Sequence, residues 1–562
     1  MACSLHPRGW SRGAEGGEKR GMLLRFAPVL GCLLLGAVAV AAPKLCYGEA
    51  TQEDGADLIL SHGVFYPVQP PRKVEGSLAV RGGRIVYLGP DAGAERLRTP
   101  KTRVIDLKGR AVTPGLIDAH SHLAGLGQSL EQVDLTGADS YGEVIRRVRE
   151  AARSLPPGAW VRGRGWDQNR WPDKRFPTHQ ELTGAVPDHP VWLTRVDGHA
   201  ALVNARAMQI LGIDASIKDP SGGRFLRDEA GLPTGVLIDN AKGWAEGRLP
   251  APSAEDRRRT LRKAALHCVE RGLTTVTDMG IGDADYRAYK ALKDAHELPL
   301  RAALFLTDDK ALLDAWLARG PEIDPDARVT VRGVKMYIDG ALGSRGAALI
   351  EPYSDDANNL GLLVSTGAHL EDVARRALAA GFQVAIHAIG DRGLQDIQRM
   401  ARLGIIASMQ PTHATSDMPW AGDRVGTRRL QGAYAWRKVL DAHGRLALGS
   451  DFPVESADPR LGLYAAVTRQ DLQGNPPGGW MPGERLTREE ALRGFTLDAA
   501  WSLFLEGEVG SLEVGKRADL VVFAQDPMTV PEREIPRAAI DYTVVDGQVV
   551  FERGTNERGS GR

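Results

Sequence analysis

The chain has 562 residues, enough for three or four average domains or for fewer if one of them is a large barrel. Its 71 Lys and Arg residues balance 71 Asp and Glu residues, so the net charge of zero disfavours a nucleic-acid-binding protein. Hydrophobic residues make up 43% and charged residues 25%, as in globular proteins, which excludes disorder of the whole chain. Four cysteines are too few for a disulfide scaffold, and the absence of a CxxC pair among them argues against a thiolate zinc site.

The N-terminus has the order of features of a secretory signal peptide. Arg25 precedes an apolar run over residues 27–40 and a small-residue segment that ends at Ala42. The run is shorter than the roughly 20 residues that span a bilayer, so a membrane anchor is the alternative interpretation. We predict a leader and signal peptide at residues 1–42, with Met1 or Met22 as the start, a linker at 43–55 and an exported (periplasmic or secreted) protein.

Short strands dominate both ends of the remaining chain. Residues 56–114 alternate β-type runs with Gly-Gly and Gly-Pro turns, and residues 506–555 repeat this style with a hairpin around Asp546-Gly547. We predict that 56–114 and 506–555 together form one composite β-sandwich.

The middle of the chain alternates strands with helices. Seven short apolar strands each end at a polar residue; they span residues 116–122, 274–278, 302–307, 334–339, 383–387, 405–410 and 446–451. Polar residues at the carboxyl ends of parallel strands are typical of the active site of a (β/α)8 barrel. We therefore predict an α/β fold with a TIM-like barrel over residues 115–505, interrupted by an insertion at 157–250.

Two strand ends offer metal ligands. His120 and His122 close the first strand, and alternate residues of a strand point to the same side, so both imidazoles can reach one ion. Asp118 can orient such a ligand from behind. Asp451 ends the last strand, where a carboxylate can ligate a metal and accept a proton from water, although an Asp after Gly-Ser can also be a helix N-cap.

Lys335 and His387 each have two interpretations. Lys335 lies in an apolar strand, where it is either a lysine reaching to the rim or a lysine whose lowered pKa allows it to take up CO2 as a carbamate. His387 ends another apolar strand, where it is either a core histidine or a further ligand.

Six motifs in order resemble the amidohydrolase superfamily, in particular its YtcJ-like branch, which is related to N-substituted formamide deformylases. They are PGLIDAHSH, GVKMYIDG, VAIHAIGD, MQPTHATSD, LALGSDFPVE and GSLEVGKRADLVVF. The resemblance implies a metal-dependent hydrolase of a non-peptide carbon–nitrogen bond, with one or two divalent ions, typically zinc, and a metal-activated water. The implied metal ligands are His120, His122, Lys335 as a carbamate, His387 and Asp451, with Asp451 also the catalytic proton-transfer residue.

The resemblance also implies a small-molecule substrate. With no nucleic acid partner expected from the balanced charge, the partner left open is a second copy of the chain in a homo-oligomer. The insertion carries aromatic and polar side chains, a usual mixture for a pocket, although they could also serve a structural role. The predicted substrate-binding residues are Trp166, Asp167, Gln168, His199, Asp339 and His413.

One expected part of the barrel is missing. Members of the branch carry a strand resembling R-x-E-H-A-Q after the HAIGD strand, and its His is a further metal ligand. Here Gly393 is followed directly by the predicted helix that precedes the MQPTH strand. One βα unit is therefore absent, and the barrel is expected to be incomplete. His413 is the nearest histidine that could substitute. The alternative to an active hydrolase is therefore an impaired or inactive exported relative that keeps the fold and pocket.

Overall fold

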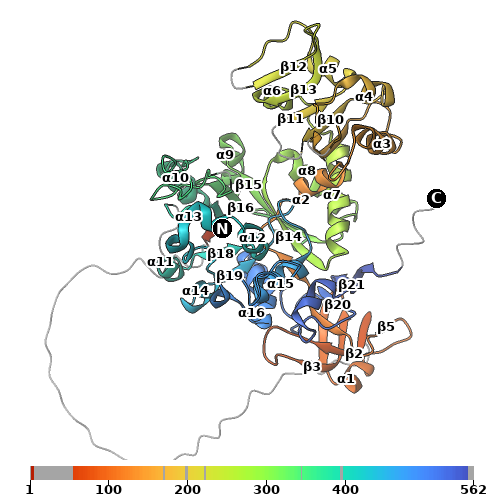
Figure 1. Ribbon diagram of the computed structural model, residues 1–562. Coiled ribbons are helices and arrows are strands. Elements are labelled where there is room, and N and C mark those ends of the chain that lie inside the picture. The colour runs from red at the N-terminus through yellow and green to blue at the C-terminus, as the bar shows by residue number, and fades with distance from the viewer. Residues whose placement is uncertain are drawn as a thin grey trace, which may run out of the picture. The chain divides into compact units, whose positions relative to one another are not determined.

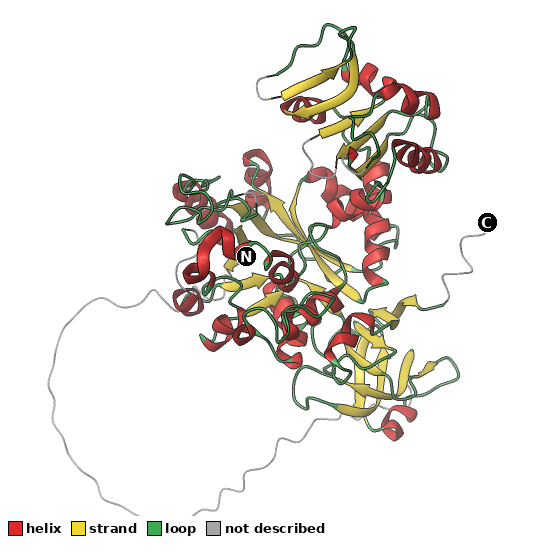
Figure 2. Cartoon of the chain, viewed as in Figure 1, coloured by secondary structure: helices red, strands yellow, loops and turns green. Residues whose placement is uncertain are grey.

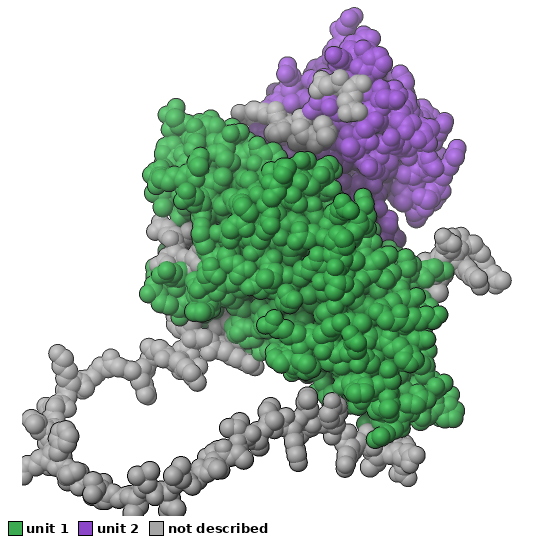
Figure 3. All heavy atoms as spheres, turned by 60° about the horizontal axis from the view of Figure 1, so that its bottom comes forward, with its two compact units in different colours: residues 1–123, 265–562 green, residues 124–264 purple. Residues whose placement is uncertain are grey.

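The structure, a computed structural model, describes residues 2–5, 55–168, 171–195, 200–220, 223–343, 345–392 and 397–554. The chain forms two compact units, residues 1–123 with 265–562, and residues 124–264 (Figure 3). Most of the predicted signal peptide and linker lies outside the described residues. Among those that are described, no helix is long and apolar enough to cross a membrane.

A curled parallel sheet forms the centre of the first unit (Figure 1). Consecutive strands of the chain pair in parallel as predicted, except the fifth and sixth, which do not pair with each other. The strand residues are almost entirely buried, which explains their continuous apolar runs. In sequence order they are β7 (Leu116–Asp118), β14 (Leu273–Ile281), β15 (Arg301–Thr307), β16 (Val329–Tyr337), β17 (Gln383–His387), β18 (Ile406–Met409) and β19 (Leu446–Leu448).

The position between β17 and β18 is occupied by a strand from the other end of the chain. This strand, β1 (Ala2–Leu5), pairs antiparallel with both neighbours, with Ala2 opposite His387 on one side and Ser408 on the other. The missing βα unit would supply a parallel strand here. Since strands buried on both edges need hydrogen-bond partners for their backbone groups, β1 satisfies edges that the truncated repeat leaves unpaired.

The two ends of the parallel series also meet. The backbone N–H of Ala119 donates to Leu448 O at 3.1 Å, and that of Asp451 donates to His120 O at 2.7 Å. The sheet is therefore an incomplete barrel in which β19 is joined to β7 through the segments that carry the predicted ligands.

Helices follow most barrel strands, as a βα repeat requires (Figure 2). In α10 (Gly367–Ala379), for example, Thr366 accepts a hydrogen bond from His369 N as the N-cap, and Leu370, Val373 and Ala377 form the buried face. The other helices of the barrel are α8 (Asp283–Asp294), α9 (Lys310–Arg319), α11 (Ile397–Arg402), α12 (Pro411–Asp417), α13 (Ala421–Leu430), α14 (Trp436–Asp441), α15 (Pro459–Thr468), α16 (Arg488–Gly494) and α17 (Leu497–Ser502), with the 3-10 turn η3 (Pro482–Glu484).

The two β-rich ends of the chain form one mixed sheet. Its strands are β2 (Leu58–Phe65), β3 (Val74–Arg81), β4 (Arg84–Gly89), β5 (Arg103–Asp106), β6 (Ala111–Pro114), β20 (Leu520–Phe523), β21 (Ile540–Val545) and β22 (Gln548–Glu552), with α1 (Asp91–Glu95) and η4 (Glu532–Arg537) beside them. The expected hairpin at Asp546-Gly547 is present, and both turn residues have positive φ. Pairing is continuous from β22 to β4, so the predicted sandwich is a single connected sheet with its own core.

The second unit has a separate six-stranded sheet. Its strands are β8 (Val133–Asp134), β9 (Val161–Trp166), β10 (Val191–Arg195), β11 (Ala200–Val203), β12 (Gly223–Arg227) and β13 (Pro233–Asp239). Its helices are α3 (Tyr141–Ala152), α4 (His179–Ala185), α5 (Ala205–Leu211) and α6 (Asn240–Glu246), while α2 (Leu123–Leu130) and α7 (Ala254–Val269) lie at its boundaries. The unit is longer than the predicted insertion 157–250 because α3 packs Val144 and Val148 into its core.

Candidate metal centre

His120 and His122 follow β7 directly, and both point their Nε2 atoms at Asp451. The distances from Asp451 Oδ1 are 3.6 Å to His120 Nε2 and 3.1 Å to His122 Nε2. His122 Nδ1 lies 2.9 Å from Met279 O, a carbonyl that can only accept, so Nδ1 carries a proton and a neutral ring would have its lone pair on Nε2. Burial lowers the pKa of His122, but the hydrogen bond to Asp451 outweighs it and raises this pKa, so without a metal ion Nε2 can donate to Asp451. The tautomer of His122 is therefore set by β14.

Asp118 connects β7 to β19 behind these ligands. Its carboxylate accepts hydrogen bonds from His120 N at 3.1 Å, from Ser450 N at 3.1 Å and from Ser450 Oγ at 2.6 Å. Burial raises the pKa of Asp118 to about 7. The close approach also requires a glycine, because a Cβ on Gly449 would lie 2.5 Å from Asp118 Oδ1.

Asp451 stands in an unusual backbone conformation. Its φ of 63° lies in the left-handed region, which Asp tolerates better than most residues and which is often used at functional sites. Burial alone would raise the pKa of its carboxyl, but hydrogen bonds with His122 and His413 hold the pKa well below the usual range. Asp451 is therefore an anion facing three imidazoles.

The donor set fits a divalent metal ion. One ligand atom from each of His120, His122 and Asp451 lies within 4.8 Å of the others. In the described part of the chain, these three residues form the cluster of side chains that could hold a metal ion. Burial and the Lys335 charge hold the pKa of His120 well below its ordinary value, so the ring is neutral, as a ligand must be. His120 Nδ1 is also buried without a hydrogen-bond partner among the described residues. Two imidazoles and a carboxylate are a common set for zinc and similar ions.

Lys335 lies beside His120 in the interior of the barrel. Its Nζ is 3.2 Å from His120 Nε2, and its side chain is almost fully buried on β16. Burial lowers the pKa of the Lys335 amine to about 8, which raises the fraction of neutral, nucleophilic amine. This burial does not fit the alternative interpretation, in which the Lys335 side chain reaches to the rim of the barrel.

His387 and Asp339 have other partners. His387 Nε2 is 3.5 Å from Gly340 O, and burial lowers the pKa of His387 to about 4, so its ring is neutral. Asp339 accepts hydrogen bonds from three backbone N–H groups, those of Ala348, Ile389 and Gly390. The predicted substrate-binding residue Asp339 therefore fastens the segment after β16 to the segment after β17.

His120, His122 and Asp451 together are called the metal-type cluster below. His413, on α12, contacts Asp451 of this cluster. Its Nε2 lies 3.4 Å from Asp451 Oδ2, and its Nδ1 lies 3.3 Å from Glu455 Oε1. Burial works against a proton on His413, but the hydrogen bonds to Asp451 and Glu455 outweigh it and raise the pKa of His413 to about 9. A protonated His413 would be a donor to Asp451 and no metal ligand.

Sequence reasoning assigned no role to Glu455. It also accepts a hydrogen bond from Ser416 Oγ at 2.6 Å and so is held against His413. The only signal was its place inside the LALGSDFPVE motif, four residues after Asp451.

The predicted substrate residues of the insertion belong to the second unit. Trp166 is fully buried, stacks on Trp171 and donates from Nε1 to Leu193 O at 2.8 Å. Asp167 and Gln168 both accept hydrogen bonds from Arg195, each at 2.8 Å. His199 lies outside the described residues.

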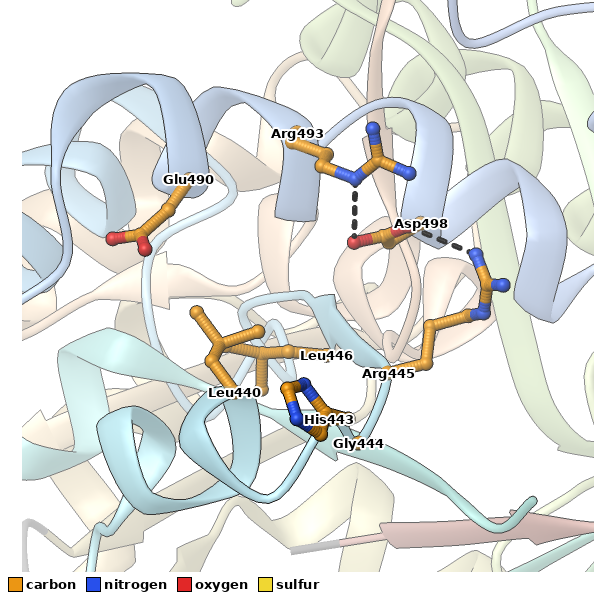
Figure 4. A pocket seen from close by; sticks show the side chains of 8 residues that line it. All are labelled: Leu440, His443, Gly444, Arg445, Leu446, Glu490, Arg493 and Asp498. Carbon is orange, nitrogen blue, oxygen red and sulfur yellow. Dashed lines mark hydrogen bonds and ion pairs between the residues drawn. The ribbon is translucent and has the colours of Figure 1, made fainter. Parts of the chain in front are cut away.

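A cavity of about 290 Å³ lies elsewhere in the first unit. It is lined by Leu446 at the first residue of β19, whereas the metal-type cluster lies past the opposite end of that strand (Figure 4). Its charged side chains are paired, since Asp498 accepts hydrogen bonds from Arg445 and Arg493, both at 3.2 Å. We therefore assign it no catalytic role.

Comparison with protein families gives a match over most of the chain. The model of the amidohydrolase family matches residues 103–397 and 393–551. The two matches meet at residues 393–397, where the sequence predicts the missing βα unit.

Curated relatives and solved structures agree with this match. The chain is 32% identical over 543 residues to Protein LONG AFTER FAR-RED 3 of Arabidopsis thaliana, covering 88% of this chain and 92% of the relative. It is 31% identical over 496 residues to putative amidohydrolase YtcJ of Bacillus subtilis (82% and 92%), and 28% identical over 543 residues to N-substituted formamide deformylase of Arthrobacter pascens (88% and 98%). An uncharacterized metal-dependent hydrolase from Pyrococcus furiosus has a TM-score of 0.73 and 31% identity, over 84% of this chain and all of that structure.

Proposed function

Because this chain belongs to the amidohydrolase family, in its YtcJ-like branch, we propose that it hydrolyses the carbon–nitrogen bond of a small non-peptide amide of the N-acyl or N-formyl type. The observation that carries the proposal is the convergence of His120, His122 and Asp451 within 4.8 Å at the carboxyl ends of barrel strands. The formamide deformylase among the relatives supports the substrate class.

His120, His122 and Asp451 would hold the divalent ion, which we propose to be zinc. When bound, such an ion polarises a carbonyl oxygen and lowers the pKa of water enough for attack near neutral pH. The bond between His122 Nδ1 and Met279 O keeps Nε2 aimed at the ion's position.

Asp451 is the proposed proton-transfer residue. It accepts the proton of the attacking water and passes it to the leaving nitrogen, so that the amine departs neutral. His413, held by Glu455, is within 3.4 Å of Asp451 and can keep the second carboxylate oxygen aligned while the first one receives the proton.

Lys335 would take part as a carbamate. Its buried amine, in the neutral form, can add CO2 with release of one proton to solvent, which would place an anionic oxygen ligand beside His120. With His387, this carbamate would form a second and weaker metal position, so the number of bound ions is one or two.

The experiment measures metal content and hydrolysis in the same preparations. We expect at least one tightly bound divalent ion and metal-dependent turnover of N-formyl or N-acyl amines. Both should be lost in His120→Ala/His122→Ala, whereas His369→Ala, which changes an exposed histidine paired with Asp308, should keep both. Metal content below about a tenth of an equivalent, or turnover that survives the double substitution, would overturn the proposal.

The second candidate is an inactive relative that keeps the fold. The observation in its favour is the sixth barrel position, which holds the antiparallel strand β1 where the branch carries a strand with a metal-ligating His. A preparation that binds metal at His120 and His122 but hydrolyses no amide would support this candidate. Metal-dependent turnover of any amide would exclude it.

Export is a separate proposal. It rests on the basic, apolar and small-residue order of residues 25–42. The test is the N-terminal sequence of the protein recovered from the periplasm or medium of a bacterial host. A start near residue 43 supports export and means that the exported protein lacks β1, which pairs with β17 and β18 in the uncleaved chain. Recovery of the intact chain only from the cytoplasm contradicts export.

A further inference from the structure

A second pocket lies wholly inside the unit formed by residues 124–264. It has a volume of about 210 Å³ and is built on β9 and β10, with α6 beside them. Its lining includes Arg162, Arg164, Trp192, Thr194 and Lys242. None of these residues belongs to the metal-type cluster or to the proposed reaction.

The strand register explains why these side chains share one face. β9 and β10 are parallel, with Arg162 opposite Trp192 and Arg164 opposite Thr194. Since side chains alternate between the faces of a sheet, Arg162 and Arg164 project to the same side. The intervening Gly163 belongs to the other face, where a Cβ would meet Leu193.

The positive charge in this pocket is poorly compensated. Lys242 is paired with Glu246 at 2.6 Å, one turn along α6. Within the described part of the chain, neither the Arg162 nor the Arg164 guanidinium has a hydrogen-bond or ion-pair partner. With Arg162, Arg164 and Lys242 against Glu246 alone, the lining carries a formal charge of 3 − 1 = +2.

Arg162 is the more unusual of the two arginines. Its side chain is half-buried, and this burial lowers its pKa, while the charge of Asp256 on α7 acts in the opposite direction. A cation withdrawn from water is costly unless it gains a partner of opposite charge. The guanidinium fork, with five donors, is suited to planar or tetrahedral oxyanions.

We propose that this pocket binds a phosphoryl group, either as free phosphate or as a small phosphate monoester. Arg162 and Arg164 would donate to its oxygens, Lys242 would add a point charge, and the Trp192 indole would contact the apolar part of an ester. A dianion matches the +2 lining, and the cavity is too small for a large ligand. The proposal is independent of amide hydrolysis, since all lining residues lie in the second unit.

Equilibrium dialysis of the full-length protein with labelled inorganic phosphate tests the site. A chelator-treated sample and the His120→Ala/His122→Ala variant remove phosphate binding at the metal centre from the measurement. We expect saturable binding of one phosphate that weakens as salt rises. Competition by phenyl phosphate more strongly than by phosphate would identify the ester as the better ligand, and the reverse would identify free phosphate.

Variants locate the binding to the pocket. Arg162→Ala and the charge reversal Arg164→Glu should each weaken phosphate binding by about tenfold or more, since one charge-assisted hydrogen bond is worth roughly that factor. Arg149→Ala, an exposed arginine on α3, is the matched control and should bind as the parent does. Because Arg164 is exposed, its reversal leaves folding intact even if the half-buried Arg162 cannot be replaced. Absence of saturable binding, or equal losses in Arg149→Ala and Arg164→Glu, would overturn the proposal.

Discussion

Replacing Asp118 by Ala should damage both the stability and the metal affinity of the barrel. The carboxylate is buried and accepts hydrogen bonds from His120 N, Ser450 N and Ser450 Oγ. Alanine leaves all three donors without their acceptor. It therefore weakens the junction between the ends of β7 and β19, which carry the two histidines and Asp451 and remain joined by the backbone bonds of Ala119 and Asp451.

The magnitude follows from the donors that lose their partner. Ser450 Oγ can rotate toward another acceptor, but the N–H groups of His120 and Ser450 are fixed by the backbone. Each buried unsatisfied donor costs about 1–3 kcal/mol, so we expect Asp118→Ala to lower the free energy of unfolding of the first unit by about 3–5 kcal/mol. Loss of this orienting group should also weaken metal binding by about 10–100-fold.

Urea unfolding followed by circular dichroism measures the first effect, and competition with a chromophoric chelator measures the second. Asp118→Asn keeps the shape and one acceptor oxygen, so it should cost about 1–2 kcal/mol. Asp188→Ala, an exposed residue, is the matched control and should change stability by less than about 0.5 kcal/mol. If Asp118→Ala unfolds within about 1 kcal/mol of the parent and keeps its metal affinity, the carboxylate does not join the two strands as argued.

Other perturbations test the remaining charged contacts. Lys335→Ala should lose activity and the second ion, and short carboxylic acids at high concentration should partly restore both; full metal content in this variant would contradict the carbamate. Glu455→Gln removes an anion that raises the pKa of His413, which is about 9, so the alkaline limb of the kcat profile should move down by about one pH unit, and an unchanged profile would contradict the contact. Burial raises the pKa of Asp546, but the charge of Arg301 outweighs it and the pKa lies below its ordinary value. Asp546 therefore contributes stability above about pH 4 that is lost as pH falls, and Asp546→Asn should make the urea midpoint less sensitive to acid; an equally steep acid loss would contradict this.

The barrel strands were predictable because buried parallel strands leave a clear signature. Each is a short apolar run whose polar residue comes at its carboxyl end, as in the segment from Leu116 to His122. The same rule brought His120, His122 and Asp451 to one place before any distance was known. The family match confirms the resemblance that the six motifs predicted.

Side-chain partners were harder to predict than strands. A strict alternation along β9 would place Trp166 on the same face as Arg162 and Arg164. The register shifts between Thr194 and Arg195, and Gly165 has a φ of 108°, so Trp166 turns to the opposite core. The prediction of Trp166 as a substrate-binding residue rested on the mixture of aromatic and polar side chains in the insertion, and that mixture does not report the shift that turns Trp166 into the core.

Asp339 illustrates a second limit. A carboxylate at the end of a barrel strand fits the pattern of a functional residue, yet its oxygens accept three backbone N–H groups from other segments. Such long-range backbone partners depend on how loops fold back, which no periodicity in the sequence reports. The pairing of β1 with β17 and β18 is of the same kind, because its partners lie almost four hundred residues away.

The position of the missing unit separates the two halves of the predicted ligand set. His120, His122 and Asp451 come from β7 and β19, whose junction is fastened by backbone bonds and by Asp118. His387 ends β17, the strand that borders the position where β1 replaces the lost parallel strand. The absence of the parallel strand removes the expected metal-ligating His next to His387. It leaves intact the contacts of Asp118 that join β7 to β19. We therefore propose a first metal position at His120, His122 and Asp451 that survives the truncation and a second, weaker one beside His387, an arrangement that would allow a shortened barrel to keep the proposed amide hydrolysis.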